Sequence, residues 1–280
     1  MHIDQAEGPP IAFHVNTSLA GKRVIATDVA RLRTAARVIL EHGAAVHQLA
    51  FRLSDTHLHW LLLCSRSEAG EFLRRVSAAL HWRLALEAPF LPAEYTPVRT
   101  QSHLVRAFWY ILRQEWHHGT AFDPLHEGSS LPDALGWRAV DSSLPARVAG
   151  TLPRARRTEL LELLGPLALA FASDNVPPLA LSCLSDAAGA AFAVADLTAG
   201  QSAAHVRARR LAMEVAAQQA PAPGALSTRA LAHALGLSQR RCQAFLASRS
   251  QASPRDDPAH RAVLAQWRLR SCTRAAEVAA

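Results

Sequence analysis

Apolar and polar residues alternate with two different periods in the first half of the chain. Residues 11–16 alternate as in a β-strand, and residues 46–64 hold two β-type runs separated by Ser54 and Asp55, which predicts two adjacent strands joined by a turn. Residues 27–42, 68–86 and 101–118 instead carry apolar side chains at helical spacing. Gly43 and Gly119 follow the first and last of these helices, as is typical of helix ends.

This order of elements predicts an α+β domain. Strand, helix, two strands, helix, a short extended piece around Pro92 and Pro97, and a final helix suit an antiparallel sheet with helices on one face. Residues 121–153 are rich in Pro, Gly, Ser and Asp, so we expect the domain boundary there, between residues 1–140 and 150–280. The second domain is expected to be all helical, with helices over 157–172 and 205–219 and a group of short helices after 221–224.

Composition narrows the class of protein. Of the 280 residues 50% are hydrophobic, the formal net charge is +7, and Lys22 is the only lysine, so arginine carries nearly all the positive charge. This balance favours a polyanionic partner, although a GC-rich genome would also enrich arginine. The chain shows neither an export signal nor a long apolar segment, and its four cysteines form no Cys-x-x-Cys pair, so we expect a reduced, cytoplasmic, non-membrane protein. These cysteines are Cys64, Cys183, Cys242 and Cys272.

The most informative motif is a pair of histidines in the predicted third strand. His57 and His59 are two residues apart, so in a strand both side chains point to the same face. Two convergent imidazoles can hold a divalent cation, but pairs of this kind on half-exposed strands are also common without a ligand.

The predicted helix over 101–118 carries a second candidate group. Tyr110 and Gln114 are four residues apart and therefore neighbours on a helix face, whereas the apolar stripe lies elsewhere. We expect this polar face to lie opposite the histidine pair, although a single helix tyrosine is often only a packing residue. The stripe consists of Leu104, Phe108, Ile111 and Leu112, and the polar face also holds His103, Arg106 and His117.

Taken together, residues 11–137 resemble the HUH single-tyrosine transposases, and the REP-associated tyrosine transposases in particular. Phe13-His14-Val15 is similar to the opening strand, His57-Leu58-His59 matches the HUH motif, and Tyr110-Ile111 matches the start of the nucleophile helix. Gln114 stands where the family has an amide metal ligand. Ser54-Asp55-Thr56 replaces the usual Met-Pro-Asn, and the Asn-Pro after the tyrosine helix is replaced by Gln-Glu-Trp-His-His, differences that bear on substrate specificity.

The resemblance implies a ferredoxin-like HUH domain that cuts and rejoins single-stranded or hairpin DNA. His57, His59 and Gln114 would hold Mg²⁺ or Mn²⁺, and Tyr110 would attack phosphorus to give a 5′-phosphotyrosine and a free 3′-hydroxyl. Arg106 is a candidate phosphate contact. Further candidates for phosphate contacts are Arg74, Arg75, Arg83 and Arg99, and candidates for base stacking are Trp82 and Trp109.

Residues 227–248 fit a helix-turn-helix. Ala232 and Gly236 are small where two helices would approach, and Leu231, Leu235, Leu237, Cys242 and Phe245 take the apolar positions. The second helix then presents polar residues to duplex DNA, namely Ser238, Gln239, Arg240, Arg241 and Gln243. Helical hairpins of this kind also occur as structural or dimerisation units, so whether the chain acts alone or as a homodimer stays open.

Three alternatives remain beside a strand transferase. A domesticated DNA-binding regulator would keep the fold but no longer cut DNA. A metal hydrolase of the amidohydrolase type would need a barrel that a helical second half cannot supply. A purely structural interaction protein would use none of these residues chemically.

Overall fold

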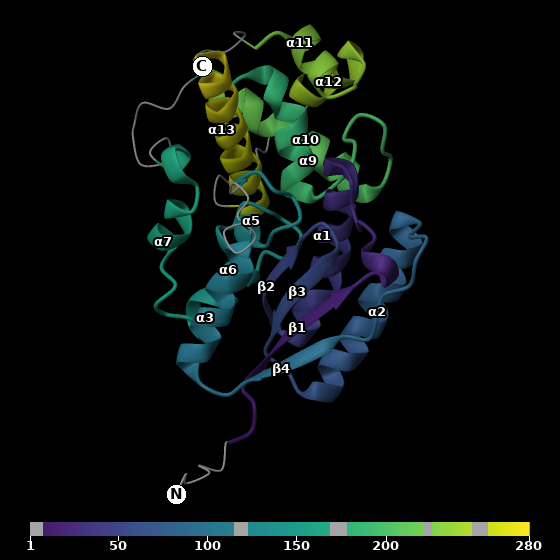
Figure 1. Ribbon diagram of the computed structural model, residues 1–280. Coiled ribbons are helices and arrows are strands. Elements are labelled where there is room, and N and C mark those ends of the chain that lie inside the picture. Colours follow the sequence, from purple (N-terminus) through teal and green to yellow (C-terminus); the bar gives the residue numbers. More distant parts are fainter. Residues whose placement is uncertain (1–7, 115–122, 169–177, 221–225, 248–256, 280) are drawn as a thin grey trace, which may run out of the picture. The chain divides into compact units, whose positions relative to one another are not determined.

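A computed structural model of the chain describes residues 8–114, 123–168, 178–220, 226–247 and 257–279 (Figure 1). These residues fall into two compact units. The first holds the described residues up to Leu135 together with Ser143–Leu160, and the second holds Gly136–Ser142 and the described residues from Leu161 onward. Among the described residues, no helix has both the length and the apolar character that crossing a bilayer requires.

The first unit is built on a four-stranded antiparallel sheet, as predicted. Its strands are β1 (Ala12–Ser18), β2 (Gln48–Leu53), β3 (His57–Leu62) and β4 (Glu94–Val98), in the spatial order β2-β3-β1-β4. Helix α1 (Val29–Gly43) leads from β1 to β2, and α2 (Arg66–Leu84) leads from β3 to β4, with short 3-10 turns at Ala20–Lys22 and Ala44–Val46. The chain therefore combines sheet and helix in the α+β manner.

The two faces of this sheet pack against different helices. On one face Trp60 meets Phe72 of α2 edge to face, with ring centroids 6.0 Å apart, and Arg31 of α1 donates to the carbonyl of Leu84 at 2.7 Å. The other face, which includes Leu61, is covered by α3 (Gln101–Leu112), which contacts β2 and β3. The expectation of helices on one face is thus right for α1 and α2 but wrong for α3, whose apolar stripe needs an apolar surface of its own.

Local capping explains where the helices begin. Asp28 accepts a hydrogen bond from the backbone of Arg31 at 2.8 Å, Ser65 and Glu68 form a capping box, and Thr100 accepts from the backbone of His103 at 3.2 Å. Helix α3 ends at Leu112, earlier than predicted, and residues 115–118 of the predicted helix lie outside the described residues.

Part of the turn-rich stretch in which the sequence predicts the domain boundary closes an edge of the sheet. Gly128 accepts a hydrogen bond from the backbone of Leu53 at 2.8 Å, and Phe51 and Ser130 exchange bonds of 2.9 and 3.0 Å. These bonds satisfy backbone groups that an edge strand would otherwise expose. The opposite edge strand, β4, contains Pro97, which an edge position tolerates.

Short helices follow this stretch along the chain. They are α5 (Leu131–Ala134), α6 (Leu144–Thr151) and α7 (Arg157–Glu162), followed by the 3-10 turn η3 (Gly165–Leu167). The helix predicted over 157–172 therefore stops early, because Gly165 has a φ of +57° and Pro166 follows it. Residues 169–172 lie outside the described residues.

The described part of the second unit is helical. Its elements are the 3-10 turn η4 (Leu181–Cys183) and the helices α9 (Leu184–Phe192), α10 (Ala203–Gln219), α11 (Thr228–Ala234), α12 (Gln239–Ala247) and α13 (Pro258–Ala279). Leu184, Leu211, Leu231 and Trp267 are buried members of one hydrophobic core. The nearly straight run of α13 and the paired α11 and α12 are visible in Figure 1.

Candidate active site

Three histidines and a tyrosine come together on the α3 face of the sheet. His14 is on β1, His57 and His59 are on β3, and Tyr110 is on α3. Ring centroids are 4.8 Å apart for His57 and His59, 5.2 Å for His14 and His59, and 5.6 and 5.8 Å from Tyr110 to His14 and His59. The predicted convergence of His57, His59 and Tyr110 is therefore present, and His14 joins it.

His14 and His59 are hydrogen bonded to each other. His14 Nε2 lies 3.0 Å from His59 Nδ1. Burial, reinforced by the nearby positive charge of His103, lowers the pKa of His14 to about 4. His14 is therefore neutral at pH 7, and its Nε2 can accept a hydrogen bond from a nitrogen that carries a proton. His59 itself is only 5% exposed, whereas His14 is half-buried.

Tyr110 stands at the boundary between the cluster and solvent. Its neighbours Ala107, Phe108 and Ile111 are buried and anchor α3 on the sheet, whereas Tyr110 is 37% exposed. Arg106 lies one turn earlier on α3 and is exposed. Residues four apart on a helix are neighbours on its surface, so Arg106 and Tyr110 share one side of α3.

Gln114, the amide ligand expected one helical turn beyond Tyr110, lies just after the end of α3. It follows the end of α3, whose C-cap is Arg113, and it is buried at 1% exposure. The continuous helix that would place Gln114 one turn beyond Tyr110 ends between them.

The spacing of His57 and His59 suits a shared cation. A ligand nitrogen lies about 2.1 Å from a bound divalent ion, so two imidazoles on one ion have centroids roughly 4.5–5 Å apart. The observed 4.8 Å falls in this range. No group of three or more His, Cys, Asp or Glu side chains in the described part of the chain is arranged to hold a metal ion, so amide oxygens or water would complete the coordination of a cation here.

Positive charge lies on one side of the histidines. Arg52 pairs with His59 in the β2-β3 register and is 2% exposed. Burial lowers its pKa to about 10, which leaves the guanidinium charged at neutral pH. On the β4 side Glu94 and Thr96 are exposed, so this flank of the face is open to solvent.

Several residues proposed from the sequence as DNA contacts have other partners. Arg74 and Arg75 both bind Glu71, at 2.8 and 2.6 Å. The guanidinium of Arg113 lies 4.7 Å over the ring of Trp109. Trp82, in contrast, is 83% exposed on α2.

Sequence reasoning missed Asn16 and gave His14 no chemical role. Asn16 pairs directly with His59 in the β1-β3 register, so it lies on the same face as the cluster. Its Oδ1 is buried and accepts no hydrogen bond from the described residues. The alternation of β1 indicates which of its residues share a face, but only the pairing register shows that this face meets His59.

In the second unit, α11 and α12 are joined by a tight turn. Gly236 in this turn has a φ of +62°, and a Cβ there would lie 2.7 Å from the Cβ of Thr198. Ser238 accepts from the backbone of Arg241 at 3.3 Å and begins α12. Leu231, Leu235 and Cys242 are buried in the core, as their apolar pattern predicted. The predicted DNA contacts on α12 are all exposed: Gln239, Arg240, Arg241 and Gln243.

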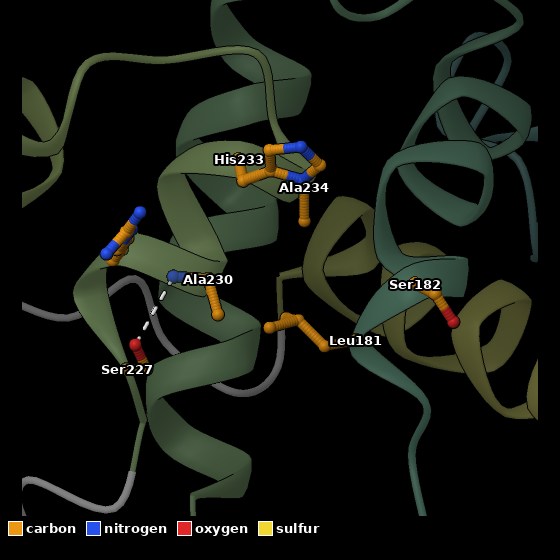
Figure 2. Close-up of a pocket in the computed structure, with 7 residues that line it drawn as sticks. Leu181, Ser182, Ser227, Ala230, His233 and Ala234 are labelled. Carbon is orange, nitrogen blue, oxygen red and sulfur yellow. Dashed lines mark hydrogen bonds between the residues drawn. The ribbon is translucent and has the colours of Figure 1, made fainter.

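A hollow of about 660 Å³ lies beside α11 in the second unit. Figure 2 shows Leu181 and Ser182 of η4 on one side, and Ala230, His233 and Ala234 of α11 on the other. Ser227 accepts from the backbone of Ala230 at 3.3 Å and caps α11. The lining is mostly small or apolar, and it shares no residue with the histidine cluster of the first unit.

The chain was compared with protein-family models, curated proteins and solved structures. No family model, curated protein or solved structure matches the chain.

Proposed function

We propose that the first unit is a metal-dependent single-tyrosine strand transferase that acts on single-stranded or hairpin DNA. The observation that carries the proposal is the convergence of His57 and His59 with Tyr110, contributed by a strand and a helix that are about fifty residues apart in the chain. The element order and the sheet order β2-β3-β1-β4 support a ferredoxin-like HUH domain.

Tyr110 is the nucleophile in this proposal. Its phenolic oxygen forms a bond to phosphorus while the bond from phosphorus to the 3′-oxygen breaks, which leaves a 5′-phosphotyrosine. The phenol loses its proton, and the departing 3′-oxygen gains one. The partial exposure of Tyr110 gives a DNA strand access, and Arg106 would hold the neighbouring phosphate.

His57, His59 and an amide oxygen, for which the sequence proposes Gln114, would hold Mg²⁺ or Mn²⁺. A bound cation would offset the negative charge that develops on the phosphate. The contribution of the chain is to fix the two imidazoles on one strand, shield His59 from water and orient its ring through His14.

A covalent adduct assay tests this function. Labelled hairpin DNA with single-stranded flanks is incubated with the protein and Mn²⁺, and denaturing gels are used to detect a protein–DNA adduct. We expect an adduct that Tyr110→Phe and chelator abolish.

Tyr95 provides a matched control, because it is the only other tyrosine in the chain and lies on the opposite face of the sheet, under the guanidinium of Arg66. Tyr95→Phe should leave the adduct intact. An adduct that persists in Tyr110→Phe would contradict the assigned nucleophile.

A second candidate is a DNA-binding regulator that does not cut. The observation that favours it is the exposed α12, where Arg240 and Arg241 lie in a stretch without an acidic residue between Glu214 and Asp256. Binding of duplex DNA together with a failure to form any adduct across several hairpins would favour this regulator.

A further inference from the structure

Asn16 occupies the position on β1 that lies nearest to His59 across the sheet. The two residues are direct partners in the antiparallel register, and Ser18 pairs in the same way with His57. Directly paired residues have Cβ atoms about 5 Å apart on the same face. The short amide of Asn16 therefore reaches the space beside the His59 ring and lies diagonally across from His57.

The amide oxygen of Asn16 has no hydrogen-bond donor among the described residues. Oδ1 is buried and accepts no hydrogen bond within the described residues. Buried polar atoms in proteins nearly always bind a donor, a water molecule or an ion. The Nδ1 atom of His59 is already hydrogen bonded to His14, so it does not serve as the partner of the Asn16 oxygen.

An amide oxygen beside two imidazoles is a suitable ligand set for a divalent cation. Mg²⁺ and Mn²⁺ accept carbonyl and amide oxygens readily, and the 4.8 Å separation of the His57 and His59 rings leaves room for a shared ion. Gln114, the amide expected from the sequence, follows the end of α3, whereas Asn16 is fixed inside the sheet by pairing on both sides, with His59 and with Glu94.

We propose that Asn16 Oδ1 supplies the amide ligand of a divalent cation held by His57 and His59. This assignment rests on the proposed function, because it takes the same cation to be the one that assists Tyr110. It moves the third ligand from the tyrosine helix to the first strand. The cation would then be held by β1 and β3 alone, so that α3 and Tyr110 could shift without releasing it.

The test measures Mn²⁺ affinity directly, by calorimetry and by the electron paramagnetic resonance signal of unbound Mn²⁺. Asn16→Leu keeps the size of the side chain but removes the oxygen, and Asn16→Asp keeps an oxygen in the same place. We expect Asn16→Leu to weaken Mn²⁺ binding at least about tenfold and Asn16→Asp to retain or strengthen it. Gln114→Leu is the matched loss of a buried amide and should have the smaller effect.

Thermal melts show whether a variant has simply unfolded. Without metal, the melting temperature of Asn16→Leu should equal or exceed that of the natural protein, because the substitution removes a buried oxygen that accepts no hydrogen bond from the described residues. The rise in melting temperature that Mn²⁺ gives the natural protein should disappear in this variant and persist in Asn16→Asp.

Several results would overturn the assignment. One is that Asn16→Leu binds Mn²⁺ as tightly as the natural protein does. Another is that Asn16→Leu and Asn16→Asp lose Mn²⁺ affinity equally. A third is loss of Mn²⁺ binding in Gln114→Leu or Glu94→Gln while Asn16→Leu still binds.

The adduct assay separates this inference from the proposed function. If Mn²⁺ binds through Asn16 but no adduct forms on Tyr110, the ligand assignment stands and the function fails. If Asn16→Leu binds Mn²⁺ and forms the adduct like the natural protein, the function stands and the ligand assignment fails.

Discussion

His14 Nε2 lies 3.0 Å from His59 Nδ1, across the neighbouring strands β1 and β3. Because burial and the nearby His103 lower the pKa of His14 to about 4, His14 is neutral at pH 7. A neutral His14 can accept a hydrogen bond from the Nδ1–H of His59, and the Nε2 of His59 then carries the lone pair that a cation needs. This tautomer of His59 requires that His14 carry its own proton on Nδ1 and accept through Nε2.

Replacing His14 should weaken metal binding without removing a ligand. His14→Phe keeps a ring of similar size but has no acceptor for His59, so we expect Mn²⁺ affinity to fall roughly ten- to hundredfold. His14→Gln restores an acceptor and should recover part of this loss. Calorimetry measures the affinity, and nitrogen NMR of His59 reports whether Nδ1 still carries its proton. An unchanged affinity in His14→Phe would show that His14 does not orient His59.

The stability of the metal-free protein should depend on pH through His14. Its folded pKa is about 4 against 6.5 for the ordinary side chain, so between these values the unfolded chain binds a proton that the folded chain excludes. The stabilisation is complete above about pH 6.5 and is lost as the pH falls toward 4, by at most about 3 kcal/mol. Urea unfolding between pH 7 and 5 measures this fall.

Two variants assign this pH dependence to His14. His14→Phe should flatten the fall in the free energy of unfolding, whereas His81→Gln, at an exposed position on α2, should not. Equal slopes in the natural protein and in His14→Phe would contradict the assignment.

Two glycines should respond oppositely to alanine. Gly236 has a φ of +62° and closely approaches Thr198, so Gly236→Ala should destabilise the second unit by about 1–3 kcal/mol. Gly150 lies in α6 with open space around it, so Gly150→Ala should stabilise by about 0.5–1 kcal/mol. Denaturant unfolding measures both free energies. A neutral Gly236→Ala would show that the turn between α11 and α12 adapts easily.

The sequence predicted the elements better than their contacts. The periods that identify β1, β2, β3, α1 and α2 are local, so their ends were predicted to within a few residues. The closing of the β2 edge by Ser130, in contrast, joins groups 79 residues apart, and the contact between His14 and His59 spans 45 residues. Neither contact produces a periodic pattern in the sequence, so the sequence indicates only a domain boundary in 121–153 and an ordinary strand residue at His14.

Only the part of the candidate site that depends on a local pattern could be predicted from the sequence. Alternation in β3 places His57 and His59 on one face without knowledge of any partner strand. The role inferred for Asn16 depends on the register between β1 and β3, and the position of Gln114 depends on where α3 ends. The strand register and the end of α3 depend on tertiary packing, which short-range sequence patterns do not predict.

The arginines of α12 should determine how strongly the chain binds duplex DNA. Arg240 and Arg241 are exposed, and the sequence between Glu214 and Asp256 holds no acidic residue. Each phosphate contact releases condensed counterions, so Arg240→Ala and Arg241→Ala should each weaken binding and lower the salt slope by about one. Fluorescence anisotropy with duplex DNA over a range of salt concentrations measures both quantities.

Control variants in the same anisotropy measurement distinguish binding through overall positive charge from recognition of the DNA sequence by α12. Arg74→Ala should have little effect, because Arg74 is already paired with Glu71. Gln239→Ala and Gln243→Ala should change the preference among duplex sequences more than the salt slope, because amide side chains read base edges in the major groove. If Arg74→Ala lowers the salt slope as much as Arg240→Ala does, the binding follows overall positive charge and α12 is not the DNA-reading helix.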